Sequence, residues 1–220
     1  MLVTLDQVKE KPDAQALIRA ADDQLGALGY TEHGFRHAGL VANIAQNVLL
    51  RLGRPERQAQ LAAIAGYLHD IGNVVNRQDH ATAGALVARD LLREMGMRWD
   101  ELALVVGAIG NHEERIGEPA SDVSAALIIA DKSDVHRTRV RNQNPLTFDI
   151  HDRVNSASQR SFVRVNDHDK TITLEITIDK EQASLADYFN IFLPRMMFIK
   201  RSSDFLGVQF RLEINQTRML

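Results

Sequence analysis

Apolar residues recur every three or four positions between residues 12 and 158, a spacing typical of helices that bury one face. Glycines, prolines and helix-capping side chains separate these apolar runs. Thr31, for example, is expected to cap the second helix, and Gly53 is expected to end it. The predicted helices span residues 12–28, 31–52, 55–70, 80–95, 100–111, 122–137 and 147–158.

The period of the pattern changes to two after residue 158. Thr171 to Ile178 alternates polar and apolar side chains, as expected for a half-buried strand. A helical spacing returns between residues 184 and 201, where Pro194 is expected to introduce a kink. Two further strands are predicted at 162–166 and 206–214, and a hairpin turn at 167–170.

The chain is therefore expected to be mainly α, with a helical bundle followed by a small C-terminal α+β unit of ββαβ order. We place the helical domain at residues 13–158 and the ββαβ subdomain at residues 159–220. The edges of a three-stranded sheet favour pairing with another chain or cover by the helical domain, so a homodimer through this unit is one expectation.

One stretch differs from the other predicted helices, LAAIAGYLHDIGN at residues 61–73. Leu61 to Leu68 carries no charge and mixes small with large apolar side chains, which is the composition of a helix packed on several sides. His69 and Asp70 follow directly. Because a carboxylate in apolar surroundings is costly unless it is paired or binds a metal, Asp70 is a candidate metal ligand.

Other histidines and an aspartate lie at the ends of the predicted helices. Each helix has an apolar stripe that must face a common core, so polar residues beside these stripes are expected to converge. Asp131, like Asp70, ends an apolar run. Buried carboxylates close to imidazoles form a suitable site for divalent cations. The candidate ligands are His37, His69, Asp70, His80, His112 and Asp131.

Taken alone, each of these residues also has an ordinary explanation. His37 and His80 could be surface histidines, or core histidines with satisfied hydrogen bonds. His112 could complement the dipole at a helix C-terminus. Asp131 could be the partner of an arginine. The order in which the residues occur, and their joint occurrence, favour the metal site.

Composition narrows the chemistry further. The 220 residues include no cysteine, so disulfides and thiolate ligands are excluded and a metal site must use histidine and carboxylates. A net charge of -3 argues against binding of a nucleic-acid polymer. The sequence contains neither a transmembrane run nor a signal peptide, so we expect no membrane association and a cytoplasmic location.

In this order, His37, His69-Asp70, His80, His112 and Asp131 resemble the H…HD…H…H…D motif of the HD-domain superfamily of metal-dependent phosphohydrolases. HDIG is a typical wording of the motif, and HATAGALVA at residues 80–88 is similar to the second-histidine helix of members with two metal ions. The resemblance covers residues 31–137 and implies an HD-domain helical bundle.

The resemblance also implies a cofactor of two divalent transition-metal ions, with Asp70 between them. Iron and manganese are the expected metals, and zinc, nickel, cobalt and magnesium are alternatives. The implied ligands are His37, His69, Asp70 and Asp131 for one ion, and His80 and His112 for the other.

Three departures from the motif of another branch bear on the substrate. Members of the HD-GYP branch, which hydrolyse cyclic dinucleotides, have HDIGK and a tandem HHE followed by GYP. In this chain Asn73 replaces the lysine, Asn111 replaces one histidine and no GYP follows. Cyclic di-GMP is therefore not the expected substrate. The motif is closer to small-molecule members such as symmetrical dinucleoside-polyphosphate hydrolases or nucleotide phosphatases.

Basic residues beside the motif are candidates for binding the phosphate of a substrate. They are Arg36, Lys132 and Arg137. Arg139 and Arg141 could equally belong to a solvated basic helix end.

His33 lies one turn before the first ligand and is a candidate to bind a metal or to orient a ligand. Glu113 and Glu114 are expected at the surface, where one of them could orient His112. His151 and His168 are expected to be exposed and are given no role.

The activity that the resemblance implies is hydrolysis of a nucleotide or another small phosphate ester or anhydride by a hydroxide shared between the metals. Asp70 and Lys132 are the candidate catalytic residues, Asp70 between the metals and Lys132 as a counter-charge to the phosphoryl oxygens. Two alternatives stay open. One is a di-iron oxygenase with the same ligands, and the other is a non-catalytic HD module acting as a sensor or regulator.

Overall fold

All seven predicted helices are present, with shifts at their ends, in the computed structural model, which describes residues 2–142 and 144–220. A short helix that the sequence analysis missed, α1, precedes them. The helices are α1 Leu5–Glu10, α2 Pro12–Ala27, α3 Phe35–Arg51, α4 Glu56–Leu68, α5 His80–Glu94, α6 Trp99–Gly110, α7 Asp122–Lys132 and α8 Ile150–Ala157, with 3-10 turns η1 Ile71–Val74, η2 Arg137–Arg139 and η3 Pro145–Thr147.

Helix α3 begins four residues after the predicted cap, so the prediction for Thr31 was wrong. Gly34 is the N-cap residue and offers no side chain. The carboxylate of Glu32 caps the helix instead. Its Oε1 accepts hydrogen bonds from the backbone N–H of Gly34 at 2.8 Å and from that of His37 at 3.4 Å. Helix α7 also differs, since it ends at Lys132 rather than near Arg137.

Helix α4 is buried along most of its length, as its composition predicts. Every residue from Leu61 to Leu68 is buried. The small residues allow close packing: a Cβ on Gly66 would lie only 3.0 Å from the backbone of Ala42 in α3. The backbones of α3 and α4 therefore approach closely, which brings the start of α3 near the end of α4.

The C-terminal unit forms a four-stranded sheet in the order β1-β2-β3-β4. Strands β1 and β2 form an antiparallel hairpin, and β2 pairs in parallel with β3 after the crossover through α9. The mainly α class with a small α+β unit is thus confirmed. The elements are β1 Ser158–Asn166, β2 Thr171–Ile178, α9 Leu185–Phe205, β3 Gln209–Ile214 and β4 Thr217–Arg218.

The sheet differs from the prediction in three details. Strand β1 begins at Ser158, earlier than predicted, and has an irregular register near Arg160. Strand β3 begins only at Gln209, because Gly207 turns the chain with φ 78°. The two-residue strand β4 was not predicted, since it is too short to show a period.

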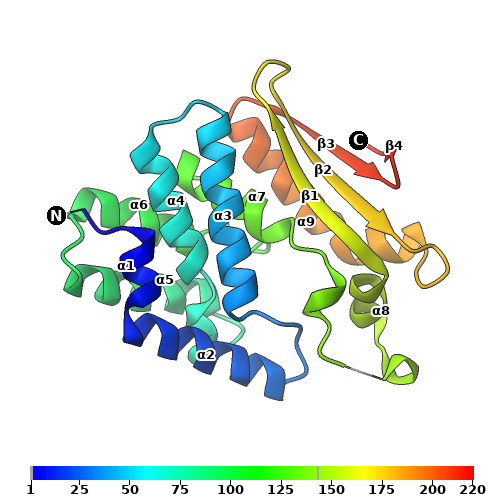
Figure 1. Ribbon diagram of the computed structural model, residues 1–220, viewed down its shortest axis with the longest axis horizontal. Helices are drawn as coiled ribbons and strands as arrows, with labels where there is room; N and C mark the ends of the chain where they lie inside the picture. The colour runs from blue at the N-terminus through cyan, green and yellow to red at the C-terminus, as the bar shows by residue number, and fades with distance from the viewer. Residues whose placement is uncertain (1, 143) are drawn as a thin grey trace.

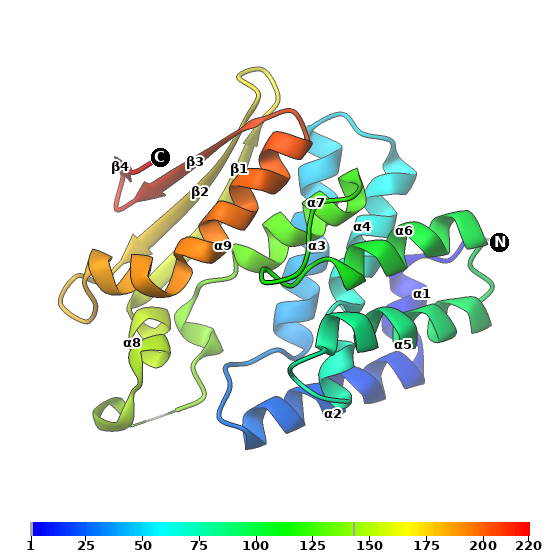
Figure 2. The ribbon, with the colours of Figure 1, turned by 180° about the vertical axis from the view of Figure 1, so that it is seen from behind.

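Helix α9 connects the two parts of the molecule. It covers one face of the sheet and contacts α7 of the helical part (Figures 1 and 2). Pro194 lies inside α9, and the helix changes direction along its length in Figure 2. The buried apolar residues of both parts form one continuous cluster. The division into two domains near residue 158 stays a prediction.

Among residues 2–142 and 144–220, no helix combines the length and the apolar character needed to cross a membrane.

Candidate metal centre

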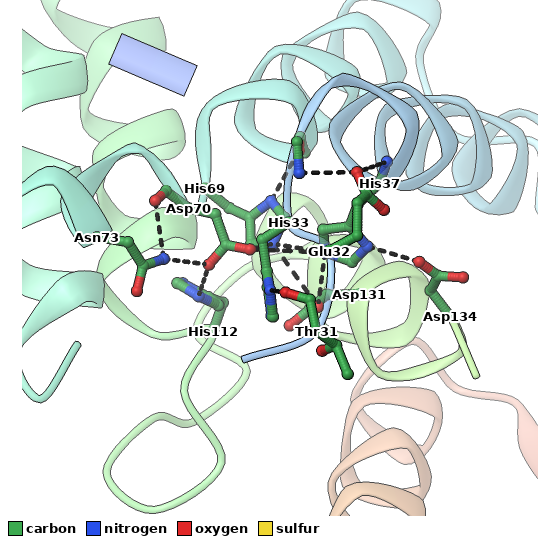
Figure 3. Close-up of polar contacts among 12 residues, drawn as sticks. Thr31, Glu32, His33, His37, His69, Asp70, Asn73, His112, Asp131 and Asp134 are labelled. Atoms are coloured by element: carbon green, nitrogen blue, oxygen red, sulfur yellow. Dashed lines mark hydrogen bonds and ion pairs between the residues drawn. The ribbon is translucent and has the colours of Figure 1, made fainter. Parts of the chain in front are cut away.

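The structure brings all six candidate ligands together. His37 lies in the first turn of α3, Asp131 in the last turn of α7, and the others at the ends of α4, α5 and α6. Figure 3 shows five of these side chains pointing toward one another. All six are buried, and the side chain of His37 is 0% exposed. The six residues are His37, His69, Asp70, His80, His112 and Asp131.

Asp70 lies between two pairs of histidines. Its Oδ2 is 3.1 Å from Nε2 of His69 and 3.6 Å from Nε2 of His37. Its Oδ1 is 3.7 Å from Nε2 of His80 and 3.9 Å from Nε2 of His112. The two carboxylate oxygens therefore face different imidazole pairs, which is the arrangement expected of a carboxylate between two metal ions.

Asp131 joins only one of these two groups. Its Oδ1 lies 3.4 Å from Nε2 of His37 and 3.6 Å from Nε2 of His69. Asp131 thus completes a set of two imidazoles and two carboxylates on one side of Asp70. The other side has His80 and His112 with Asp70.

All four imidazole rings are held through Nδ1. Each Nδ1 lies within hydrogen-bond distance of an oxygen that can only accept, so Nδ1 carries the proton and Nε2 is bare in the neutral ring. Metal-ligating histidines are held in this way. The Nδ1 distances are 2.7 Å from His37 to Asp134, 2.8 Å from His69 to the carbonyl of Gly66, 2.9 Å from His80 to that of Arg77 and 2.6 Å from His112 to that of Ile109.

The Nε2 atoms of the four histidines lie close together in two pairs. Nε2 of His37 lies 3.3 Å from Nε2 of His69, and Nε2 of His80 lies 3.1 Å from Nε2 of His112. Oδ2 of Asp70 is buried and finds no hydrogen-bond partner within the part of the chain that the structure describes. Lone pairs brought together in this way repel unless a cation lies between them. The donor set therefore fits metal ions.

The electrostatics of the site also favour a cation. Burial acts to lower the pKa of His69, but Asp70 and Asp131 outweigh it and raise this pKa to about 10, so without a metal Nε2 of His69 holds a proton that a bound metal ion would replace. Burial acts to raise the pKa of Asp131, but Lys132 and the histidines hold it well below its usual range. Both carboxylates stay ionised, so the site attracts positive charge.

Asp134 orients His37, and the sequence analysis missed it. Its Oδ2 accepts from Nδ1 of His37 at 2.7 Å (Figure 3). The same oxygen accepts from Arg36 at 2.8 Å. Burial would raise the pKa of Asp134, but Arg139 and His37 hold it far below its usual range. Its position three residues after Asp131 was the available signal, because a chain turn there returns Asp134 to the site.

We expect Asp134→Ala to weaken metal binding by about 10- to 100-fold, the usual effect of removing a group that orients a metal-ligating histidine. Metal titration of the purified protein measures this effect. Asp134→Asn should retain part of the affinity, because the amide oxygen can still accept from Nδ1 of His37. Equal metal affinity in wild type and Asp134→Ala would contradict the orienting role.

Two more residues contact the ligands. Asn73 donates to Oδ1 of Asp70 at 3.0 Å and to its backbone carbonyl at 2.9 Å, so it fixes the carboxylate. Glu113 was expected at the surface, but it is only 7% exposed and its Oε2 lies 3.6 Å from Nε2 of His80. Glu113 is buried because the turn after α6 folds it back toward α5.

Lys132 and His33 lie beside the cluster. Lys132 is buried, and its ammonium lies 2.7 Å from Asp131 and 2.8 Å from Glu114. His33 lines the same small cavity as Lys132, with its Nδ1 held 2.6 Å from the carbonyl of Thr31. The role of Lys132 toward a phosphate and the role of His33 stay predictions.

The other predicted phosphate-binding residues lie elsewhere. Arg36 pairs with Glu32 at 2.7 Å and with Asp134, and it lines a separate cavity between α3 and β1. Arg137 is exposed in η2. Arg139 was considered a solvated helix end, but it is 3% exposed and its guanidinium donates to the carbonyl oxygens of Glu32 and Asp134.

Comparisons with known proteins identify the family of this chain. The HD domain family model matches residues 34–139, the span that carries all six residues. An uncharacterized protein of Methanocaldococcus jannaschii is 30% identical over 182 aligned residues, covering 71% of this chain and 68% of that protein. A crystal structure described as a predicted HD superfamily hydrolase, from an uncultured Thermotogales bacterium, is 28% identical with a TM-score of 0.46, covering 61% of this chain and 75% of that one. This chain belongs to the HD-domain superfamily.

Proposed function

We propose that this protein hydrolyses a phosphate ester or anhydride of a small molecule, such as a nucleotide or a sugar phosphate, with the help of two divalent metal ions. The observation that carries the proposal is the position of Asp70, whose two oxygens face two separate pairs of bare imidazole nitrogens. Bound metal ions of this kind lower the pKa of water and offset the charge that develops on phosphoryl oxygens.

The distances support the ligand sets that the resemblance implies. His37, His69, Asp70 and Asp131 would hold one ion, and His80 and His112 would hold the other together with Asp70. Imidazole and carboxylate ligands without thiolate suit iron or manganese, and zinc, nickel, cobalt and magnesium are alternatives. Lys132 binds Asp131 and adds positive charge to the wall of the site.

The shape of the site supports a small substrate. A cavity of about 20 Å³ borders Asp70 and Asp131, and a cavity of about 400 Å³ shares several of its wall residues. The larger volume is in the range of sites for small molecules. The ligands themselves are buried, so a substrate reaches them with one group rather than along its whole length.

The proposal is tested with protein reconstituted with Mn²⁺ or Fe²⁺ and assayed for phosphate release from a panel of nucleotides, sugar phosphates and phosphate esters. His69→Ala and Asp131→Ala should each lose bound metal and abolish turnover, because each contributes to the set that includes Asp70. His168→Ala is the control, since this histidine is exposed in the turn between β1 and β2. It should keep both metal and activity.

Metal-loaded protein that releases no product from any phosphate substrate would contradict the proposal. Oxygen consumption by the iron-loaded protein with an organic substrate would then indicate the oxygenase, which uses the same ligands. A protein that binds metal and shows neither activity would be a sensor or regulatory module.

A further inference from the structure

The two cavities share residues that come from both parts of the chain. The small inner cavity borders the metal cluster, and at about 20 Å³ it holds little more than a water molecule. The outer cavity, at about 400 Å³, is lined by residues of the helical part, including α8, and by residues of α9. Arg77 and Arg195 line both cavities, so they lie where a substrate would pass from one to the other.

Among the arginines that line the outer cavity, Arg77 and Arg195 are the ones suited to a ligand. Arg139 is buried and tied to two backbone carbonyls. The side chain of Arg115 is 81% exposed and points into solvent. The side chains of Arg77 and Arg195 are 28% and 26% exposed, so each is half-buried in the wall with donors that a ligand can reach.

Each of these two guanidinium groups lies over an aromatic ring. The guanidinium carbon of Arg77 is 5.6 Å from the ring centre of Tyr30, and that of Arg195 is 5.0 Å from the ring centre of Phe192. Both rings also line the outer cavity. Stacking of this kind restricts a guanidinium and leaves N–H groups that can donate, which prepares it to bind an anion. In Arg77 one of these groups is already used, because Nη1 donates to Oδ1 of Asn73 at 3.2 Å.

Arg195 is less closely paired with carboxylates than Lys132, the other cation beside it, so it can bind a ligand anion. Lys132 is matched by two carboxylates at hydrogen-bond distance, Asp131 and Glu114. Arg195 has a looser partner, because its Nε lies 3.7 Å from Glu114. Glu114 therefore lies closer to Lys132 than to Arg195, which leaves Arg195 with donors for a ligand.

We propose that Arg195 and Arg77 together bind the phosphate of the substrate at the junction of the two cavities, so that the C-terminal unit completes the substrate site through α9. The inference rests on the proposed function and narrows its substrate class. A terminal phosphate carries about two negative charges near neutral pH. Two guanidinium forks match such a group, and they favour a phosphomonoester or the terminal phosphate of an anhydride over a diester.

The test measures binding of inorganic phosphate to the Mn²⁺-loaded full chain by calorimetry. Arg195→Ala should weaken phosphate affinity by about tenfold, the usual effect of losing one charge-assisted contact, without loss of bound metal. Arg201→Ala is a matched control from the same helix. Like Arg195, Arg201 stacks on the phenylalanine three residues before it, with its guanidinium carbon 4.9 Å from the ring centre of Phe198. Its Nε also lies 3.5 Å from a glutamate, Glu118, but this pair is exposed at the protein surface.

Arg195→Gln removes the charge but keeps the first part of the side chain, and it replaces the alanine variant if that one fails to fold. Equal phosphate affinity in the Arg195 and Arg201 variants would overturn the inference. With p-nitrophenyl phosphate as substrate, Arg195→Ala should raise KM about tenfold, with a smaller effect on kcat. If Arg195→Ala hydrolyses p-nitrophenyl phosphate with the KM and kcat of the wild type, this inference alone is contradicted. Phosphate binding through Arg195 without hydrolysis of any ester contradicts the proposed function alone.

Discussion

Asp70→Ala is expected to remove both metal ions from the protein and, with them, all measurable hydrolysis. One oxygen of Asp70 faces His37 and His69, and the other faces His80 and His112. Its loss would therefore take a ligand from each of the two proposed ions. Elemental analysis of the purified variant, together with phosphate release, measures the two effects.

His112→Ala provides the comparison. This variant removes a ligand from one side only, because Nε2 of His112 lies close to His80 and to Oδ1 of Asp70. We expect it to retain one ion per chain, held on the side of His37, His69 and Asp131. Asp90→Ala, an exposed carboxylate that pairs with its neighbour Arg89, should retain both ions. Two ions per chain in Asp70→Ala would show that this carboxylate does not lie between the metals.

The convergence of the six residues could be predicted from the sequence because each one is tied to an apolar run. Asp70 and Asp131 each end a run that must be buried, and helices that bury such runs share one core. A residue at the end of a buried helix is thus placed near the core by local information alone. The strands of the α+β unit could be predicted for a similar reason. The alternation of polar and apolar residues from Thr171 to Ile178 is a local pattern that indicates a strand.

The pairing of Asp134 with His37 could not be predicted, because the two residues lie 97 positions apart in the sequence. The position of Asp134 three residues after Asp131 places it near the site, but it does not identify His37 as its partner. Arg195 belongs to α9, and its place in the cavity wall depends on how the C-terminal unit packs on α7. Such contacts depend on tertiary packing. The spacing of apolar residues along the chain does not predict them.

Other errors had local signals that were overlooked. Helix α1 begins with a capping box, in which Thr4 and Gln7 bond to each other's backbone, and this pattern is visible in the sequence. The cap of α3 is different. A glutamate two residues before the N-cap, Glu32, replaces the expected threonine, and its side chain also binds Arg36 beside the first ligand.

Gly72→Ala is expected to have a large effect on the fold near the site. Its Cβ would lie 2.0 Å from the carbonyl oxygen of His80 and 2.3 Å from the backbone nitrogen of Gly84. Both are backbone atoms of α5, so no side-chain rotation relieves the clash and the first turn of α5 must move away from η1. We expect a loss of about 3 kcal/mol or more in the free energy of unfolding, the upper range for overpacking.

The same displacement should affect the two metal ions unequally. His80 begins α5 and would move away from Asp70, whereas the first ion's ligands on α3, α4 and α7 do not depend on this contact. Gly72→Ala should therefore lower the metal content toward one ion per chain, which elemental analysis measures alongside chemical unfolding.

Two other glycines provide a graded series. At Gly84 a Cβ would lie 3.1 Å from the carbonyl oxygen of His69, so Gly84→Ala should be milder than Gly72→Ala. At Gly107, inside α6, a Cβ has no neighbour within 4 Å among the described residues, so Gly107→Ala should stabilise the helix by up to about 1 kcal/mol. If all three variants unfolded alike and kept two ions, the contact between η1 and α5 would not be what holds His80 beside Asp70.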